Sequence, residues 1–141
     1  MAFFTDSTEL QQILGGFFER MRDDTDLGPR VRTAEVLVTF FLSDPDLTVT
    51  VDGVSPPVQN GHFNLYYGPP PLAPAVTLTL SADNAHRFWQ GRLNVMLALA
   101  QKQVIIEGSA GKMLALLPVV APAFERYRAY LTEIGRADLL A

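Results

Sequence analysis

Apolar and polar positions follow a helical period at the start of the chain. Asp6 and Glu9 have the spacing of a capping box, in which the Asp6 carboxylate accepts from the first free N–H groups. Apolar residues then recur every three or four positions and form one stripe: Leu10, Ile13, Leu14, Phe17, Phe18 and Met21. The pattern predicts an amphipathic helix that ends at the acidic residues 23–26 and Gly28-Pro29. Gly15-Gly16 weakens it by about 1 kcal/mol per glycine, so we expect a neighbour to pack closely there.

The middle of the chain has the pattern of strands. Residues 35–43 are rich in β-branched and aromatic residues and are apolar on both faces, which is typical of a central strand. Residues 47–51, 62–67 and 76–80 are shorter strand candidates, and Asp52-Gly53 and Asn60-Gly61 predict turns. We also expect a short strand near Val58. The segment 68–74, GPPPLAP, cannot join a sheet because its prolines lack N–H donors.

The final third returns to short helices around one strand. Helix N-caps are expected at Ser81 or Asp83, at Asn94 and at Ser109. The strand is expected over 103–107, and Pro118 is expected to end the helix that begins at 110. A last amphipathic helix has an inner stripe of Phe124, Tyr127, Leu131 and Ile134. Helices segregated from hairpin-linked strands indicate an α+β fold with a mostly antiparallel sheet.

Length and composition narrow the class of protein. A chain of 141 residues, 48% apolar and 18% charged, is long enough for one domain, residues 1–141, with a sizeable core. The net charge of −4 argues against nucleic acid as a partner. The absence of cysteine removes disulfides and cysteine–zinc sites, and it is compatible with the reducing cytoplasm, where we expect the protein. The longest apolar run, residues 113–124, is too short and too proline-rich to insert into a membrane, and the start lacks the basic region of a signal peptide.

Motifs for chemistry are missing from the sequence. His62 and His86 do not have metal-ligand spacing, and the acidic residues between 44 and 53 lack the glycine and glutamate of a calcium loop. Gly108-Ser109-Ala110-Gly111 has the wrong spacing for a nucleophile elbow, and no phosphate-binding glycine motif occurs. We therefore expect no catalytic residue, no metal and no cofactor.

The last 60 residues hold an excess of apolar side chains in short elements broken by proline and glycine. Such elements either fill a solid core or line a cavity, since methionine and aromatic side chains adapt to irregular shapes. The sequence pattern alone is compatible with a solid core and with a ligand cavity.

Residues 76–117 contain a specific order of elements: the strand Val76–Leu80, the capped helix from Ala82, the turn Gly91-Arg92-Leu93, the helix Asn94–Gln101, the strand Lys102–Glu107, Gly108 and the leucines of 113–117. In this order the segment resembles the sterol carrier protein 2 domain family. Upstream, the opening helix and the strand pair 35–43 and 47–52 have the family's order, so the resemblance spans roughly residues 10–120. The sequence departs from the family at Ala100-Gln101, where a glycine is common, and in the proline-rich segment 68–74.

The resemblance implies a five-stranded, mainly antiparallel sheet covered on one face by helices, with an apolar tunnel between them. It implies a protein that binds or transports a sterol, fatty acyl chain or similar lipid without transforming it. The residues expected to line the site are Phe88, Trp89, Leu93, Met96, Met113, Leu117, Val120 and Phe124, with the Tyr127 hydroxyl near the ligand's head group. The segment 123–135 is expected to close the cavity as a lid hinged at Pro118 and Pro122.

Two other functions stay open. As an interaction module for a separate enzyme acting on lipophilic substrates, or as a homodimer, the chain would use the same apolar surface as an interface, with Arg87 and Arg92 at its rim. A small pocket enzyme resembling ketosteroid isomerase would need a buried carboxylate or tyrosine, and its candidates, Asp83, Glu107 and Tyr66, have no evident partner. We therefore expect a binding protein and not an enzyme.

Overall fold

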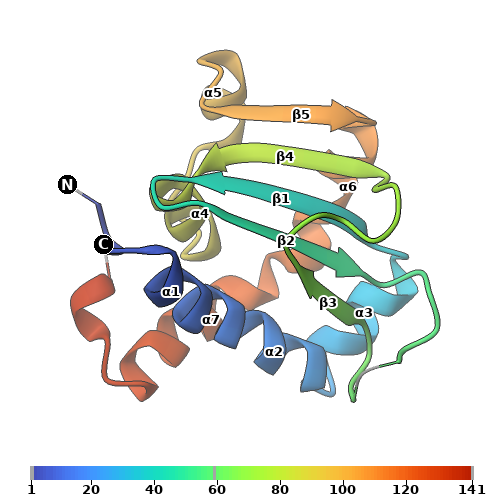
Figure 1. The fold of residues 1–141 in the computed structure, drawn as a ribbon, viewed down its shortest axis with the longest axis horizontal. Helices are drawn as coiled ribbons and strands as arrows, with labels where there is room; N and C mark the ends of the chain where they lie inside the picture. The colour runs from blue at the N-terminus through green and yellow to red at the C-terminus, as the bar shows by residue number, and fades with distance from the viewer. Residues whose placement is uncertain (1, 59, 141) are drawn as a thin grey trace.

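The computed structural model describes residues 2–58 and 60–140 and contains a five-stranded sheet in the order β3-β2-β1-β4-β5 (Figure 1). The strands are β1 (Leu37–Ser43), β2 (Leu47–Asp52), β3 (Asn64–Tyr67), β4 (Val76–Ser81) and β5 (Val104–Gly108). The pairs β1–β2, β2–β3 and β4–β5 are antiparallel, and β1–β4 is parallel. The long strand predicted over 35–43 is therefore central, as expected.

Helices lie mainly on one side of this sheet (Figure 1). They are α1 (Ser7–Leu10), the π-helical η1 (Gln11–Gly15), α2 (Gly16–Asp23), α3 (Leu27–Thr33), α4 (Ala82–Trp89), α5 (Val95–Ala100), α6 (Ala110–Val120), α7 (Pro122–Glu133) and the 3-10 helix η2 (Ala137–Leu139). The α+β class, the mostly antiparallel five-stranded sheet and the helices on one face are thus confirmed. A continuous tunnel between sheet and helices is not seen among the described residues, which enclose only small voids.

The alternation along the strands decides which face is the core. Val38 and Phe40 of β1 pair with Val76 and Leu78 of β4, and these side chains face the helices. The stripe predicted for the opening helix packs against the same core, since Leu10, Ile13, Leu14, Phe17, Phe18 and Met21 are all buried. The strands, whose side chains alternate with a period of two residues, and the opening helix, whose apolar stripe has a period of about 3.6 residues, therefore pack together in one apolar layer.

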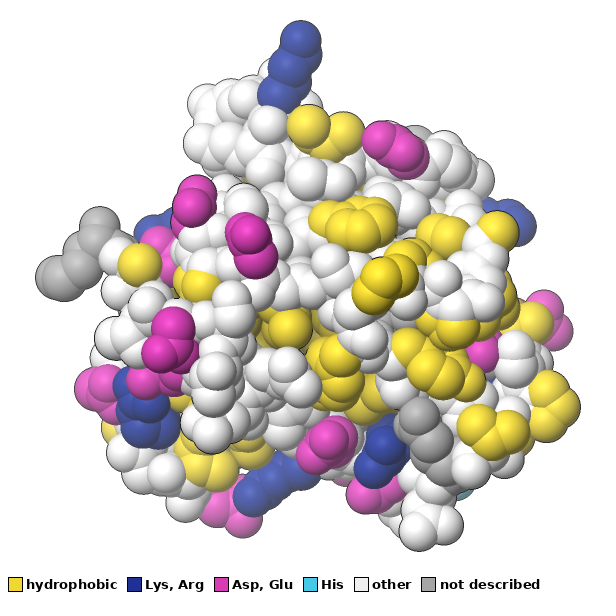
Figure 2. All heavy atoms as spheres, viewed as in Figure 1, with side chains coloured by type: hydrophobic (Ala, Val, Ile, Leu, Met, Phe, Trp, Pro, Cys, Tyr) yellow, Lys and Arg dark blue, Asp and Glu magenta, His cyan; other side chains and the backbone are white. Residues whose placement is uncertain are grey.

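The opposite face of the sheet is crossed by the proline-rich connection between β3 and β4. This connection passes in front of β2 and β1 in Figure 1, from Gly68, whose N–H bonds to the Thr48 carbonyl, to Ala75, whose N–H bonds to the Leu37 carbonyl. The hydroxyls of Thr39 in β1 and Thr50 in β2 form a 2.8 Å hydrogen bond, and both residues are fully buried. Figure 2 shows hydrophobic side chains across the middle of this face and charged ones mainly around its periphery.

The glycine pair of the opening helix lies where two tyrosines approach the backbone. A Cβ atom on Gly15 would lie 2.5 Å from the Tyr67 hydroxyl, and one on Gly16 would lie 2.5 Å from the Tyr130 hydroxyl. The Ile13 carbonyl of the π-helical turn accepts from the Gly16 N–H and, in addition, accepts a 2.9 Å hydrogen bond from the Tyr130 hydroxyl. The predicted close neighbour is therefore α7, together with β3.

Three local features differ from the predictions. The opening helix ends at Asp23, as predicted, but Gly28-Pro29 lies in the first turn of another helix, α3, where the N–H that proline lacks would have no helical partner. Pro118 does not end its helix, since α6 continues to Val120. The Pro118 ring lies on the exposed side of α6. The strand expected near Val58 is absent from residues 54–58 and 60–63, where Pro56 and Pro57 precede an exposed Val58.

Candidate functional site

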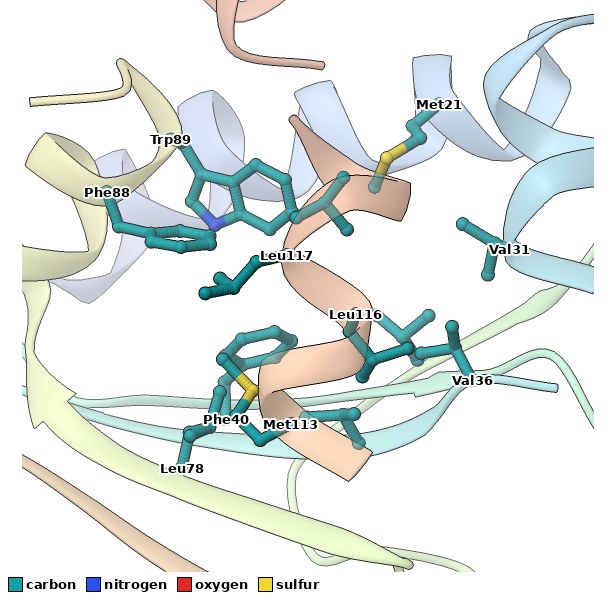
Figure 3. Close-up of a pocket in the computed structure, with 13 residues that line it drawn as sticks. Met21, Val31, Val36, Phe40, Leu78, Phe88, Trp89, Met113, Leu116 and Leu117 are labelled. Carbon is teal, nitrogen blue, oxygen red and sulfur yellow. The ribbon is translucent and has the colours of Figure 1, made fainter. Parts of the chain in front are cut away.

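An apolar cavity of about 40 Å³ lies between the sheet and α6 (Figure 3). Its walls come from every layer of the fold: Met21, Val31, Val36, Val38, Phe40, Val51, Leu78, Phe88, Trp89, Met113, Leu116, Leu117 and Val120. The volume is roughly a quarter of the about 150 Å³ of a protein cavity that binds benzene, so it is far too small for an alkyl chain as it stands.

Simple periodicities place these side chains around the cavity. Val36, Val38 and Phe40 alternate along one face, and Leu78 pairs with Phe40 across the β1–β4 ladder. On α6 the lining residues are Met113, Leu116, Leu117 and Val120, at helical spacings of three and four. α6 therefore forms the cover of the cavity, and Figure 3 shows Met113 beside Phe40 and Leu78 and Leu117 directed toward Phe88.

The lining chemistry restricts what the cavity can do. None of the thirteen side chains is charged, and the Trp89 indole holds their only nitrogen or oxygen atom. Such a surface offers no proton-transfer group, and it favours an apolar occupant over water. Elsewhere among residues 2–58 and 60–140, no three His, Asp or Glu side chains come together as a metal site.

Two further pockets adjoin the cavity. One of about 20 Å³ shares Phe40, Leu78 and Met113 with it and extends toward Leu93 and Val95. The other is a surface groove of about 330 Å³, bounded by Gly91, Leu93 and Val95 on one side and by Pro118, Ala121 and Phe124 on the other. Phe88 and Leu117 line both the cavity and this groove, so these two side chains separate the interior from the surface.

The structure places most of the predicted site residues in this region. Phe88, Trp89, Met113, Leu117 and Val120 line the cavity. Leu93 lines the small pocket and the groove, and Phe124 lines the groove.

Two predicted site residues lie elsewhere. Met96 is 63% exposed on α5 and lines neither the cavity nor the two adjoining pockets. Tyr127 is fully buried, and its hydroxyl lies 2.7 Å from His86 Nδ1, away from the cavity. The helical stripe that contains Tyr127 is correct, but a stripe does not tell which neighbour its residues meet.

Sequence reasoning missed the walls contributed by the first half of the chain. These are Met21, Val31, Val36, Val38, Phe40 and Val51; from the second half, Leu78 of β4 and Leu116 of α6 were missed as well. Each lies in a predicted stripe or strand alternation, except Val31, which lies in α3, a helix that the sequence pattern did not predict. The signal was therefore present, but it marks a core residue and a cavity wall alike.

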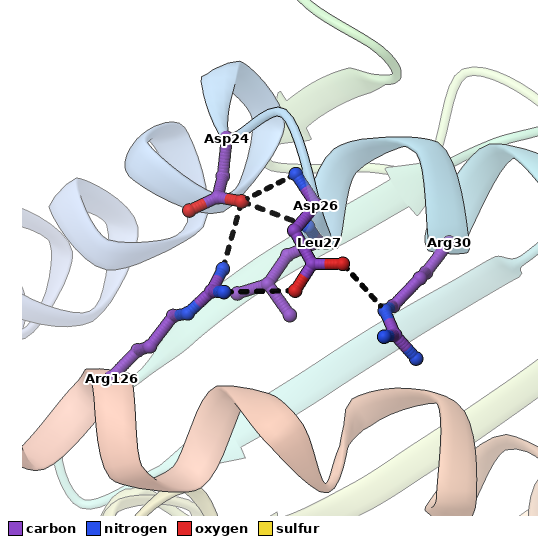
Figure 4. A network of polar contacts seen from close by, with 5 residues as sticks. All are labelled: Asp24, Asp26, Leu27, Arg30 and Arg126. Atoms are coloured by element: carbon purple, nitrogen blue, oxygen red, sulfur yellow. Dashed lines mark hydrogen bonds and ion pairs between the residues drawn. The ribbon is translucent and has the colours of Figure 1, made fainter.

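Ion pairs fix α7 beside the cover (Figure 4). Arg126 bridges Asp24 and Asp26 in the α2–α3 turn, with both N···O distances 2.8 Å, and Arg30 holds the second Asp26 oxygen at 3.0 Å. Burial alone would raise the pKa of Asp24, but the N–H groups of Leu27 and Asp26 and the Arg126 guanidinium outweigh it and lower that pKa. α7 is thereby tied to the turn at the base of α2.

Neither the protein-family models nor the curated protein sequences give a match to this chain. None of the described helices is long and apolar enough to cross a membrane.

Solved structures do match. Sterol carrier protein 2 from Yarrowia lipolytica, in its apo form, superposes with a TM-score of 0.59 at 17% identity over 87% of this chain and 94% of that one. The sterol carrier protein domain 2 of Helicoverpa armigera gives 0.59 at 22% identity over 82% and 87%. A stereoselective inverting sec-alkylsulfatase from a Pseudomonas species gives 0.53 at 15% identity over 70% of this chain, but only 14% of the enzyme.

Proposed function

We propose, from the premise that this chain has the sterol carrier protein 2 fold, that it binds a lipid or similar apolar ligand beneath α6 and carries it unchanged. The observation that carries the proposal is the cavity, whose lining is apolar throughout and which two side chains separate from an apolar surface groove. Each methylene moved from water into such a site contributes about 0.8 kcal/mol. A hydrocarbon chain therefore needs no specific polar contact to be held.

Binding requires the cavity to widen, and α6 is the element that can yield. It carries one polar side chain, Lys112, and surface grooves of about 330 and 280 Å³ lie along its two flanks. Outward displacement of α6 with rotation of Phe88 and Leu117 would join the interior to the groove. Pro118 lowers the free energy needed to displace α6, since proline removes one backbone hydrogen bond from this helix.

The segment 123–135, expected as a lid, adjoins α6 and is held to the rest of the protein by more contacts than α6. Tyr127 and Leu131 are fully buried, Tyr130 bonds to Ile13, and Arg126 holds the α2–α3 turn. We therefore propose that α7 stays in place while α6 moves about Pro118 and Pro122. A ligand-free and a ligand-loaded protein would differ in amide exchange over 110–120 and not over 123–133.

Titration with a fluorescent fatty acid tests the function. We expect saturable one-to-one binding that strengthens about fourfold for each added methylene. Met113→Asp should abolish it, while Met113→Leu should retain it because the volume is conserved. Met96→Asp is the matched control, since Met96 is exposed and should leave binding unchanged. Circular dichroism checks that each variant is folded; absence of saturable binding at every chain length contradicts the proposal.

A second candidate is an accessory module for an enzyme acting on lipophilic substrates. The observation that favours it is the match to 14% of the alkylsulfatase chain, which shows this fold as one part of a larger enzyme. On this alternative, the isolated chain would form a stable complex with an enzyme, and the fatty acid titration would show no saturable site.

A further inference from the structure

The strand β5 lies at one edge of the sheet and has an unpaired side. Among residues 2–58 and 60–140 it pairs with β4 alone, in an antiparallel register. Figure 1 shows β5 as the outermost strand, with α5 beside its start and α6 following its end. The backbone N–H and C=O groups along its outer side therefore meet no strand of the described chain, and such a row can bond to another strand.

The two edges of the sheet differ in how they are protected. β3, at the other edge, is four residues long, α2 packs beside it, and its last residue, Tyr67, lies close against Gly15. Within β5 there is neither proline nor lysine, which natural proteins use to keep edge strands from pairing, and its one charge, Glu107, lies near its end. β5 is therefore the edge that is open to strand pairing.

Exposed apolar side chains accompany this edge. Ile105 is 50% exposed and continues a cross-strand row, through Thr79 to Phe41, on the face of the sheet away from the cavity. On α5, Met96 and Leu97 are 63% and 50% exposed. Clustered apolar exposure of this kind marks surfaces that other molecules cover.

The charges at the two ends of β5 are complementary to each other. Lys102 precedes the strand and Glu107 lies near its end. Neither side chain makes an ion pair or a hydrogen bond with the part of the chain that the structure describes. When two copies of one strand pair antiparallel about a two-fold axis, the start of each lies beside the end of the other. Each Lys102 would then approach the partner's Glu107, so the edge matches a second copy of itself.

We propose that the β5 edges of two copies of this chain pair antiparallel about a two-fold axis at Ile105, which joins two five-stranded sheets into one of ten strands. Ile105 then lies opposite its own copy, and Val104 lies opposite Ile106. An axis at Ile106 is less favourable, because it would place Ile105 opposite Glu107. The pairing does not depend on a ligand, since Lys102, Ile105 and Glu107 line no part of the cavity.

The size of the contact sets the kind of dimer. A single strand pair covers less than the about 800 Å² per partner of a stable interface, so Met96 and Leu97 must add to it. We therefore expect a reversible dimer whose population rises with protein concentration.

Sedimentation velocity of the full chain between about 1 and 300 μM tests the pairing. We expect a monomer–dimer equilibrium that Ile105→Lys abolishes, because the two lysines would lie directly opposite each other. Val54→Lys is the matched control, since Val54 is 49% exposed on the β2–β3 connection and should leave the dimer unchanged. Circular dichroism checks that both variants are folded.

A charge exchange tests the antiparallel register. Lys102→Glu and Glu107→Lys should each weaken the dimer roughly tenfold, because each places like charges together at two symmetry-related positions. The double variant Lys102→Glu/Glu107→Lys should restore it, which a loss of folding would not do. Failure of the double variant to restore the dimer would overturn the proposed register.

Cross-linking tests the position of the axis, because the chain has no cysteine of its own. With diamide as the oxidant, Ile105→Cys should form a disulfide-linked dimer, since directly opposed residues of antiparallel strands lie within disulfide reach. Val54→Cys should not. A monomer at every concentration, a dimer that survives Ile105→Lys, or assemblies that grow beyond two copies would overturn the proposal. The fatty acid titration, which Ile105→Lys should leave unchanged, separates this result from the test of ligand binding.

Discussion

At the scale of single residues, Gly16 and Tyr130 are fitted to each other. The tyrosine hydroxyl bonds to the Ile13 carbonyl in the π-helical turn, and only a glycine leaves room for it at position 16. Glycine costs an ordinary helix about 1 kcal/mol relative to alanine. The Tyr130 hydroxyl therefore decides whether replacing Gly16 by alanine raises or lowers the free energy of unfolding.

In the wild-type background we expect Gly16→Ala to lower the free energy of unfolding by about 1–2 kcal/mol, because the new Cβ meets the hydroxyl at 2.5 Å. In a Tyr130→Phe background, itself about 1 kcal/mol less stable, the same change should stabilise by about 0.5–1 kcal/mol. The remaining ring atom would be 3.7 Å away, an ordinary contact. Urea unfolding of the four proteins measures this cycle; equal effects in both backgrounds would refute the fit.

His86 joins both ends of the described chain. Its Nε2 lies 2.7 Å from the Leu139 carbonyl and its Nδ1 lies 2.7 Å from the Tyr127 hydroxyl, while the rings of Phe3 and Phe4 pack against the imidazole. The carbonyl requires Nε2 to donate, so Nδ1 accepts from tyrosine and the ring is neutral. Burial lowers the pKa of His86 below its ordinary 6.5. Asp83 and Arg87 are the charged groups that act on it.

Stability should therefore fall on mild acidification. Below pH 6.5 the unfolded chain binds a proton at this histidine before the native protein does, so the contribution is complete above that pH and is lost as pH falls toward the native pKa. The slope can reach about 1.4 kcal/mol per pH unit. Urea unfolding between pH 5 and 8 should show this slope in wild type and in His62→Gln, and not in His86→Gln. An unchanged slope in the His86 variant would count against it.

At the scale of elements, α6 and α7 are adjoining helices with opposite attachments. α6 contributes apolar side chains alone to its contacts, apart from its N-cap at Ser109, whereas α7 contributes ion pairs and buried tyrosines. The two prolines near their junction also differ. Pro118 lies inside α6, where it removes a hydrogen bond, and Pro122 begins α7, where proline is favoured.

Pro118→Ala should consequently tighten the cover. An interior proline costs a helix up to about 3 kcal/mol relative to alanine, so amide exchange over 110–120 should slow and uptake of the fluorescent fatty acid should become severalfold slower. Pro122→Ala should leave both unchanged. Stopped-flow fluorescence and hydrogen exchange measure the two quantities, and an equal response to both substitutions would mean that α6 is not the moving arm.

The elements that could be predicted from the sequence are those whose ends are fixed by a few neighbouring residues. The N-caps Ser81, Asn94 and Ser109 each accept the expected backbone N–H, because this bond spans three residues. α3 was missed because its first turn holds Gly28-Pro29, and Asp24, which accepts from Leu27 N–H, lies outside the usual cap position. The cavity could not be predicted as such, because wall and core use the same side chains, and only packing in three dimensions leaves or fills a void.

At the scale of the whole molecule, ligand binding and folding are linked through the same apolar layer. A ligand that binds only the folded protein adds about 2.7 kcal/mol at a hundred times its dissociation constant. For a domain of this size the melting temperature should rise by roughly 8 °C. Calorimetry with a long-chain fatty acid should show this shift and butyrate should not, since too little hydrocarbon is buried; an unchanged melting temperature with a bound long chain would contradict the site.

Because Phe3, Phe4 and Leu139 all contact His86, the two ends of the described chain lie close together. Figure 1 shows the first and last helical turns beside each other, with the proline-rich connection 68–75 on another part of the molecule. A short peptide joining the ends, with new termini opened in that connection, would keep every strand pairing and the cover intact. Circular permutants cut there should fold, and they would present both new ends on the side of the sheet away from the cavity.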